Sequence, residues 1–379
     1  MSGGMELYLH MPFCVRKCAY CDFLSFPSGA ETQRMYAKRL MKDIDVMGKR
    51  YGEIPVETIF IGGGTPSVPD SGLIVEIMEH VRHAFHVADG AEISMEANPG
   101  TVTREKLTDY RKAGINRLSF GLQSANDREL KLLGRIHTWA EFLESFTLAR
   151  ECGFANLNID LMSALPGQTC ESWKETLSRV TDLDPEHISA YSLIIEEGTP
   201  FGERYGSEEG RKLLPDEDSE REMYHETKRF LKDCGYERYE ISNYAKPGRE
   251  CRHNIGYWTG VPYLGLGLGA SSYLDGCRFT VNPDMKQYLE EKPGMFADIE
   301  KLTKKDMEEE FFYVGLRMTA GVSLSEFERR FGISAKEVYP GLMGTFVKEK
   351  AARFEGDRFV LTDYGLDVSN YIMAQFLQD

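Results

Sequence analysis

The sequence predicts an α/β protein whose larger part is an open, partial TIM-like barrel of six strand–helix units. Apolar runs alternate with amphipathic helical stretches from residue 6 to about residue 200. The spacing of about 30 residues per unit is typical of βαβ crossovers, which join parallel strands. Six units are too few to close an eight-stranded barrel, so we expect the sheet to stay open.

Each predicted strand is a short apolar run, and each predicted helix has apolar residues at three- and four-residue spacing. In chain order the strands are Glu6–His10, Glu57–Gly62, Glu92–Asn98, Arg117–Gln123, Leu157–Ser163 and His187–Ile194. The helical patterns between them cover residues 31–50, 70–87, 103–113, 138–152 and 170–182. In such a barrel the carboxyl ends of the strands form the site.

The pattern changes after residue 200. A charged connection leads to a helix at about 217–234 and a strand at Glu237–Asn243. From about residue 300 helices dominate, with a short strand pair near Arg353–Leu361 that gives a winged-helix-like unit. We therefore expect a barrel over 1–200, an extension of it over 201–299 and a smaller, mainly helical domain over 300–379.

The composition of the chain argues against several classes of protein. The chain has 379 residues and a formal net charge of −15, which argues against a nucleic acid as the main ligand. No apolar run reaches the roughly 18 residues that a membrane span needs. The first residues lack a secretion signal, and the later cysteines lack a disulfide framework, so we expect a cytoplasmic protein.

The most informative feature is a loop with three cysteines, Cys14, Cys18 and Cys21, in C-x3-C-x2-C spacing. Cubane iron–sulfur clusters are usually held by four thiolates. Three thiolates leave one iron open, and an open iron can take the amino and carboxylate groups of S-adenosylmethionine (SAM). Zinc is the alternative, although it prefers four ligands from two separated pairs. His10 is a candidate for the fourth ligand.

Several further residues are candidates for one pocket shared with the cysteine loop, since Gly62–Pro66 follows a predicted strand, Glu96 and Gln123 lie near or at strand ends, and Asp160 lies in the fifth strand. The segment Gly62–Pro66 could cradle the methionine end of SAM, with a plain tight turn as the alternative. Glu96 could accept hydrogen bonds from ribose hydroxyls, and Arg135 could pair with a carboxylate. Taken singly, each is ambiguous. The others of this kind are Tyr8, Gln123 and Asp160.

A second concentration of unusual residues covers 251–258. His253 could be an axial iron ligand for haem. Tyr257 and Trp258 offer large planar faces for a macrocycle. The alternative is a packed aromatic turn around a hydrogen-bonded histidine.

These motifs resemble the radical SAM family of oxygen-independent coproporphyrinogen III dehydrogenases and their relatives, over nearly the whole chain. Within it, the haem-chaperone group is the most similar. The dehydrogenases have a fourth cysteine where this sequence has Phe23, and a longer segment before the position of Tyr8. Residues 253–258 also match the H-N-x-x-Y-W signature of the chaperone group.

The resemblance implies a [4Fe–4S] cluster on Cys14, Cys18 and Cys21, with SAM on the open iron. It carries SAM contacts onto Tyr8, Tyr20, Gly63, Gly64, Thr65, Glu96, Gln123, Arg135, Asp160, Ile194 and Ser271. It implies haem capture by His253, Asn254, Tyr257 and Trp258.

Similarity to the haem-chaperone group implies that the chain passes haem to apo-haemoproteins, with recipients in a respiratory membrane. The alternative is a dehydrogenase that oxidatively decarboxylates two propionates of coproporphyrinogen III to vinyl groups. The resemblance leaves open whether SAM is cleaved, whether a second SAM binds, how haem is attached and whether the chain dimerises.

Overall fold

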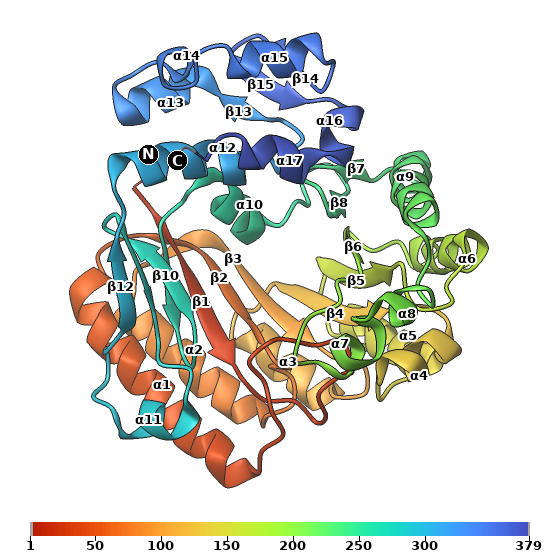
Figure 1. Cartoon of the computed structure of the whole chain (residues 1–379). Coiled ribbons are helices and arrows are strands. Elements are labelled where there is room, and N and C mark those ends of the chain that lie inside the picture. Colours follow the sequence, from red (N-terminus) through yellow and green to blue (C-terminus); the bar gives the residue numbers. More distant parts are fainter. Residues whose placement is uncertain (1–2, 378–379) are drawn as a thin grey trace.

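The computed structural model describes residues 3–377 and confirms the open partial barrel (Figure 1). Six parallel strands lie side by side in chain order. They are β1 (Met5–Met11), β2 (Val56–Gly63), β3 (Val87–Ala97), β4 (Arg117–Gln123), β5 (Leu157–Ser163) and β6 (His187–Ser192). The predicted bounds agree to within a few residues, except that β3 begins earlier than expected.

Helices between these strands cover the outer face of the sheet. They are α1 (Ala30–Tyr51), α2 (Ser71–Ala84), α3 (Arg104–Lys112), α4 (Asp127–Leu133), α5 (Trp139–Glu151) and α6 (Cys170–Thr181). The sequence did not predict α4, because its seven residues are too few to show a helical period. The sequence does contain the residues that cap this helix. The Asn126 side chain accepts a hydrogen bond from Arg128 N–H at its start, and Gly134 ends the helix at φ 76°.

Short strands extend the sheet on both sides to 12 strands. Beyond β6 lie β8 (Asn243–Ala245), antiparallel to β6, and β7 (Glu237–Arg238), antiparallel to β8, so the single strand predicted at Glu237–Asn243 is wrong. Beyond β1 lie β9 (Tyr263–Leu266), β10 (Ser271–Leu274), β11 (Cys277–Thr280) and β12 (Ala297–Lys301). Of these, β9 runs parallel to β1. Within residues 3–377, β12 and β7 are the two edge strands of this sheet. They do not pair with each other, so the sheet does not close.

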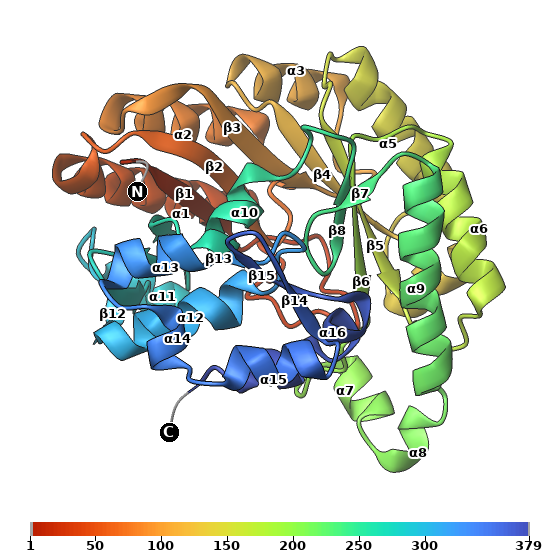
Figure 2. The ribbon, with the colours of Figure 1, turned by 90° about the horizontal axis from the view of Figure 1, so that it is seen from above.

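Five helices lie in the region between β6 and β12. They are α7 (Pro200–Tyr205), α8 (Glu208–Arg211), α9 (Glu217–Asp233), α10 (Arg252–Thr259) and α11 (Met285–Glu290). The helix α10 carries the aromatic segment that the sequence left without an assigned element. Both views show it between the amino ends of the first strands and the C-terminal domain (Figures 1 and 2).

The strands are polar on their inner face and apolar on their outer face, as β1 illustrates. Leu7 and Leu9 are fully buried in the main core, where Leu40 of α1 also lies. Glu6, Tyr8 and His10 alternate with them, so they point to the barrel interior. This alternation places a polar, concave surface opposite the helices.

The C-terminal residues form a smaller unit with its own core of Phe312, Phe327, Phe359 and Phe376. Its sheet has the order β13 (Val322–Ser323), β15 (Arg358–Leu361), β14 (Ala352–Glu355). Its helices are α12 (Lys304–Gly315), α13 (Leu324–Phe331), α14 (Ala335–Val338), α15 (Leu342–Lys348), α16 (Asp363–Asp367) and α17 (Ser369–Ala374). The predicted helical, winged-helix-like unit is therefore present.

Across residues 3–377, every helix is either too short or too polar to cross a bilayer.

Candidate functional site

The three cysteines lie in the loop between β1 and α1, at the carboxyl end of β1. Their thiols are free and only partly buried. Burial raises the pKa of the Cys21 thiol. Within the described residues, no group of three or more His, Cys, Asp or Glu side chains is arranged to hold a single metal ion. A cubane does not require such a group, because each thiolate binds a different iron.

A chain of polar contacts connects two of the cysteines through three other loops. Cys14 Sγ lies 3.6 Å from Thr65 Oγ1, which accepts a hydrogen bond of 2.7 Å from Asn98 Nδ2. Asn98 Oδ1 accepts from Arg135 Nη2 at 2.7 Å, and Arg135 Nη1 lies 3.7 Å from Cys18 Sγ. Asn98 was not among the residues predicted from the sequence. It lies at the carboxyl end of β3, as Glu96 does, so its position at a strand end could have identified it.

The glycine loop after β2 presses directly on the cysteine loop. Gly63 has φ +113°, and a Cβ there would lie 2.4 Å from the His10 ring. A Cβ on Gly64 would lie 2.7 Å from the carbonyl oxygen of Phe13. Neither position has room for a side chain, so these glycines are required by close approach and, at Gly63, by backbone conformation.

Two partly buried carboxyl groups lie near this loop, Glu96 on β3 and Asp160 on β5. Glu96 Oε2 accepts a hydrogen bond of 3.0 Å from Gly63 N–H. Burial, and then repulsion from Asp160, raises the pKa of Glu96 to about 8. Asp160 accepts from Ser119 Oγ at 2.9 Å and from Asn158 Nδ2 at 2.8 Å. The two carboxyl groups are therefore neighbours, as their strand positions predicted.

Tyr8 and His10 support the cysteine loop from β1. The Tyr8 ring stacks on Phe60, with 6.4 Å between centroids, and its hydroxyl lies 3.0 Å from His10 Nδ1. His10 Nε2 lies 2.9 Å from the carbonyl oxygen of Leu24. Both nitrogens of His10 are therefore engaged in holding the loop, so a fourth-ligand role for His10 does not fit this geometry.

The remaining predicted SAM contacts are more dispersed. Gln123 ends β4 with φ 74°, in the left-handed region. Tyr20 lies in a small apolar cluster with Phe201 and near Arg135. Ser271 begins β10 and lines the cavity described next. Ile194 follows β6, and its side chain is 68% exposed.

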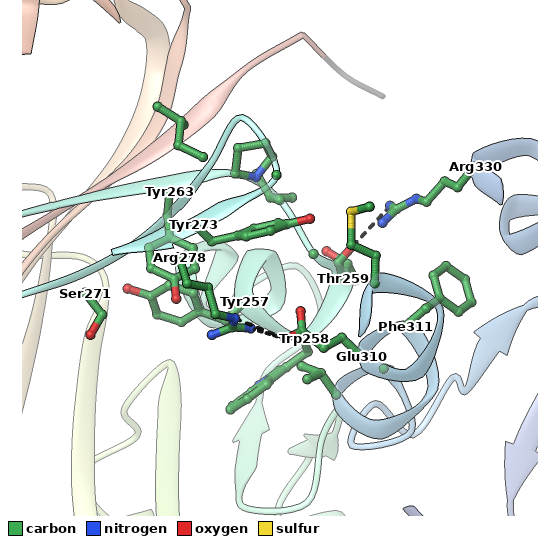
Figure 3. A pocket seen from close by; sticks show the side chains of 18 of the residues that line it. Tyr257, Trp258, Thr259, Tyr263, Ser271, Tyr273, Arg278, Glu310, Phe311 and Arg330 are labelled. Carbon is green, nitrogen blue, oxygen red and sulfur yellow. Dashed lines mark hydrogen bonds and ion pairs between the residues drawn. The ribbon is translucent and has the colours of Figure 1, made fainter. Parts of the chain in front are cut away.

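A cavity of about 1310 Å³ adjoins the cysteine loop. It lies between the inner face of β1, β9, β10 and β11 on one side and α12 and α13 on the other. Tyr8, His10 and Leu24 line its end near the cysteines, and Tyr257 and Trp258 line its wall from α10. Figure 3 shows Tyr257, Tyr263 and Tyr273 gathered around Arg278, with Phe311 and Arg330 on the other side.

His253 does not line the cavity but lies behind this wall, and only 1% of it is exposed. Its Nδ1 lies 2.7 Å from Thr58 Oγ1, and its Nε2 lies 3.0 Å from the Tyr257 hydroxyl. Its ring stacks on Phe60 at 5.2 Å. Burial, with the Arg117 charge as a second cause, lowers the pKa of His253 to about 3. Since both nitrogens are engaged, an axial role for His253 would require the contact at the coordinating nitrogen to break.

Trp258 joins α10 to the C-terminal domain. The Arg317 guanidinium lies 4.4 Å from the centre of the indole ring and donates to buried Glu240 at 3.3 Å. The indole Nε1 is buried and has no hydrogen-bond partner among residues 3–377. Asn254, on the same helix, is partly buried and is absent from the cavity lining.

The residues at the cysteine end fit an iron–sulfur cluster with a nucleoside ligand. Three thiols occupy one loop, a guanidinium lies beside Cys18, and Arg135 Nε is buried without a partner in the described chain. The glycine loop offers backbone free of side chains, and Glu96 offers an acceptor. A cluster with SAM supplies one-electron cleavage of a C–S bond when both are bound.

Comparisons with known proteins agree with this geometry. The radical SAM superfamily model matches residues 8–180, and the HemN C-terminal domain model matches 302–368. The chain is 35% identical to the heme chaperone HemW of Bacillus subtilis, over 98% of each chain. It is 34% identical to HemW of Escherichia coli, over 99% of this chain and 98% of that relative.

Among solved structures, the radical SAM enzyme coproporphyrinogen III oxidase (HemN) of Escherichia coli has the same fold. The TM-score is 0.85 at 24% identity, over 99% of this chain and 90% of that chain. Membership of the radical SAM superfamily implies a [4Fe–4S] cluster and SAM. The length and level of the sequence match establish that this chain belongs to the HemW family of radical SAM proteins.

Proposed function

We propose that this chain is a haem chaperone, which binds haem in the cavity beside α10 and passes it to apo-haemoproteins. The observation that carries the proposal is the continuity of the cavity, which runs from Tyr8 and His10 to Tyr257 and Trp258. The relatives named heme chaperone HemW support it. Recipients in a respiratory membrane are part of the same proposal and rest on the resemblance.

The aromatic wall supplies the binding surface. Tyr257 and Tyr263 pack edge to face at 4.7 Å, and Tyr273 lies 6.4 Å from Tyr263. Flat rings of this kind cover an apolar macrocycle well. His253 acts on the wall as a positioning residue, because it orients the Tyr257 hydroxyl from behind.

The cysteine end would hold the two cofactors of the superfamily. Cys14, Cys18 and Cys21 would bind three irons, and Arg135, whose Nη1 lies 3.7 Å from Cys18 Sγ, would lie beside the cluster. Glu96 would accept from the ribose hydroxyls of SAM, and Gly63, Gly64 and Thr65 would border its methionine end. Tyr8, Tyr20, Gln123, Asp160, Ile194 and Ser271 complete the proposed SAM set.

The test begins with anaerobic reconstitution of the protein with iron and sulfide. Haem is then titrated while the Soret band is followed, and transfer to apomyoglobin is measured as a probe of release. A parallel assay contains coproporphyrinogen III and SAM. Stoichiometric haem binding with transfer, and no loss of coproporphyrinogen, supports the chaperone. Consumption of coproporphyrinogen coupled to SAM cleavage supports the dehydrogenase instead.

A further inference from the structure

The cavity is basic although the chain is strongly acidic. The net charge of the chain is −15, yet the cavity lining contains more cationic than anionic side chains. The cations are Arg278, Lys304, Arg329, Arg330 and Arg358, and the anions are Asp275, Glu310 and Glu326. A cavity whose charge opposes that of the whole protein favours an anionic ligand.

One of these cations already binds a carboxylate across the cavity. Arg278 of β11 donates through Nε at 3.0 Å and lies through Nη2 at 2.7 Å from a single oxygen, Glu310 Oε1. Glu310 belongs to α12, so the pair connects the large sheet to the C-terminal domain (Figure 3). Both side chains are partly exposed, and ion pairs of this kind contribute little to stability. The carboxylate on Arg278 is therefore exchangeable.

The same guanidinium lies beside the aromatic wall. Arg278 lies 5.8 Å from the centre of the Tyr273 ring, and Tyr273 is followed by Tyr263 and Tyr257 along the wall. A wall of aromatic rings beside a guanidinium complements a planar macrocycle that carries carboxylates at its edge. An arginine can pair with such a carboxylate through two parallel hydrogen bonds, which the single oxygen of Glu310 does not provide.

We propose that Arg278 binds a propionate carboxylate of the tetrapyrrole, and that this carboxylate displaces Glu310. The inference rests on the proposed function and deepens it, because it defines the ligand class as a planar macrocycle with free carboxylates. The exchange replaces one anion by another on Arg278, so the charge at this point is unchanged. It also releases a link between β11 and α12, which would couple loading of the cavity to loosening of the two domains.

The test compares haem with haem dimethyl ester, whose propionates are blocked, on the reconstituted full chain. Soret titrations are made with the parent, Arg278→Gln and Glu310→Gln. We expect Arg278→Gln to weaken haem binding about tenfold, as loss of a charge-assisted hydrogen bond does. Glu310→Gln should tighten it, because the internal competitor is gone. Neither change should alter the affinity for the ester.

Arg353→Gln is the matched control, since Arg353 pairs with Glu355 on the exposed surface of β14, outside the cavity lining. It should leave both affinities unchanged, and melting curves check the fold of every variant. Equal weakening of haem and ester by Arg278→Gln, or unchanged haem affinity, overturns the role of Arg278. Weaker haem binding in Glu310→Gln overturns displacement. If neither haem nor its dimethyl ester binds the parent protein, the proposed function itself is wrong, independently of the role of Arg278.

Discussion

The two ends of the barrel interior use polar residues in different ways. At the carboxyl ends of the strands, polar side chains link separate loops, as Thr65, Asn98 and Arg135 link two cysteines. At the amino ends, polar side chains are buried around α10, and His253 contacts a neighbour through each ring nitrogen. The first end is the proposed site of the cluster and SAM, whereas the second end fixes the helix that forms the cavity wall.

Two glutamates on β3 show the contrast within one strand. Glu96, near the carboxyl end, accepts from the glycine loop. Glu92 accepts from Cys251 Sγ at 3.5 Å and from the backbone N–H groups of Arg252 at 3.2 Å and His253 at 3.3 Å. Since Cys251 gives α10 no side-chain cap, Glu92 satisfies the first N–H groups of that helix. The same residue type therefore contacts the glycine loop at one end and caps a helix at the other.

The largest expected effect is loss of the cluster. Cys14→Ala, Cys18→Ala or Cys21→Ala should abolish the broad visible absorption of the reconstituted protein, because two thiolates rarely retain a cubane. Cys234→Ala is the control, since Cys234 is exposed at the end of α9 and should not matter. A triple variant of the loop cysteines that still binds four irons per chain would refute the assignment.

The next effect separates the two glutamates of β3. Glu96→Gln should weaken SAM binding, measured by calorimetry, by about 1–3 kcal/mol, because it replaces one carboxyl oxygen by an amide NH2 that cannot accept from the ribose hydroxyls. Iron content should not change. Glu92→Gln should leave SAM affinity as it is and lower the melting temperature, since α10 loses its cap. If both substitutions weakened SAM binding equally, Glu96 would have no special role in binding SAM, and the proposed difference between the two ends of the barrel would be wrong.

The sequence predicted the carboxyl end better than the amino end, for physical reasons. Residues at the carboxyl ends of parallel strands meet at one edge, so Glu96 and Asp160 could be grouped without knowing the packing. The contacts of His253 come from Thr58 and Tyr257, and no rule of spacing links residues 58 and 253. Pairing of β9 with β1 was equally hidden, because it depends on tertiary packing of distant segments.

His253 itself provides the third test. His253→Ala should weaken haem binding several-fold without loss of the cluster, because Tyr257 loses the contact that orients it. Tyr257→Phe removes only the hydroxyl and should have a smaller effect. If His253→Ala alone abolishes the Soret signature of the haem complex while Tyr257→Phe preserves it, His253 is the iron ligand and the amino end also binds cargo directly.

The smallest expected effect concerns Glu6, the buried carboxyl group of β1 that lies 3.7 Å from His253 Nδ1. Burial raises the pKa of Glu6 from 4.5 to about 9, so the folded state holds a proton that the unfolded state releases. The contribution of Glu6 to stability is therefore present below pH 4.5 and is lost as the pH rises toward about 9.

Glu6→Gln keeps the shape of this side chain and removes its titration. We expect the melting temperature of the variant to exceed that of the parent by more at about pH 8 than at about pH 5. Glu53→Gln, at an exposed position, should show the same small difference at both pH values. An equal gain at both pH values for Glu6→Gln would mean that the carboxyl group is ionised in the folded protein. The amino end of the barrel would then hold a buried carboxylate beside His253.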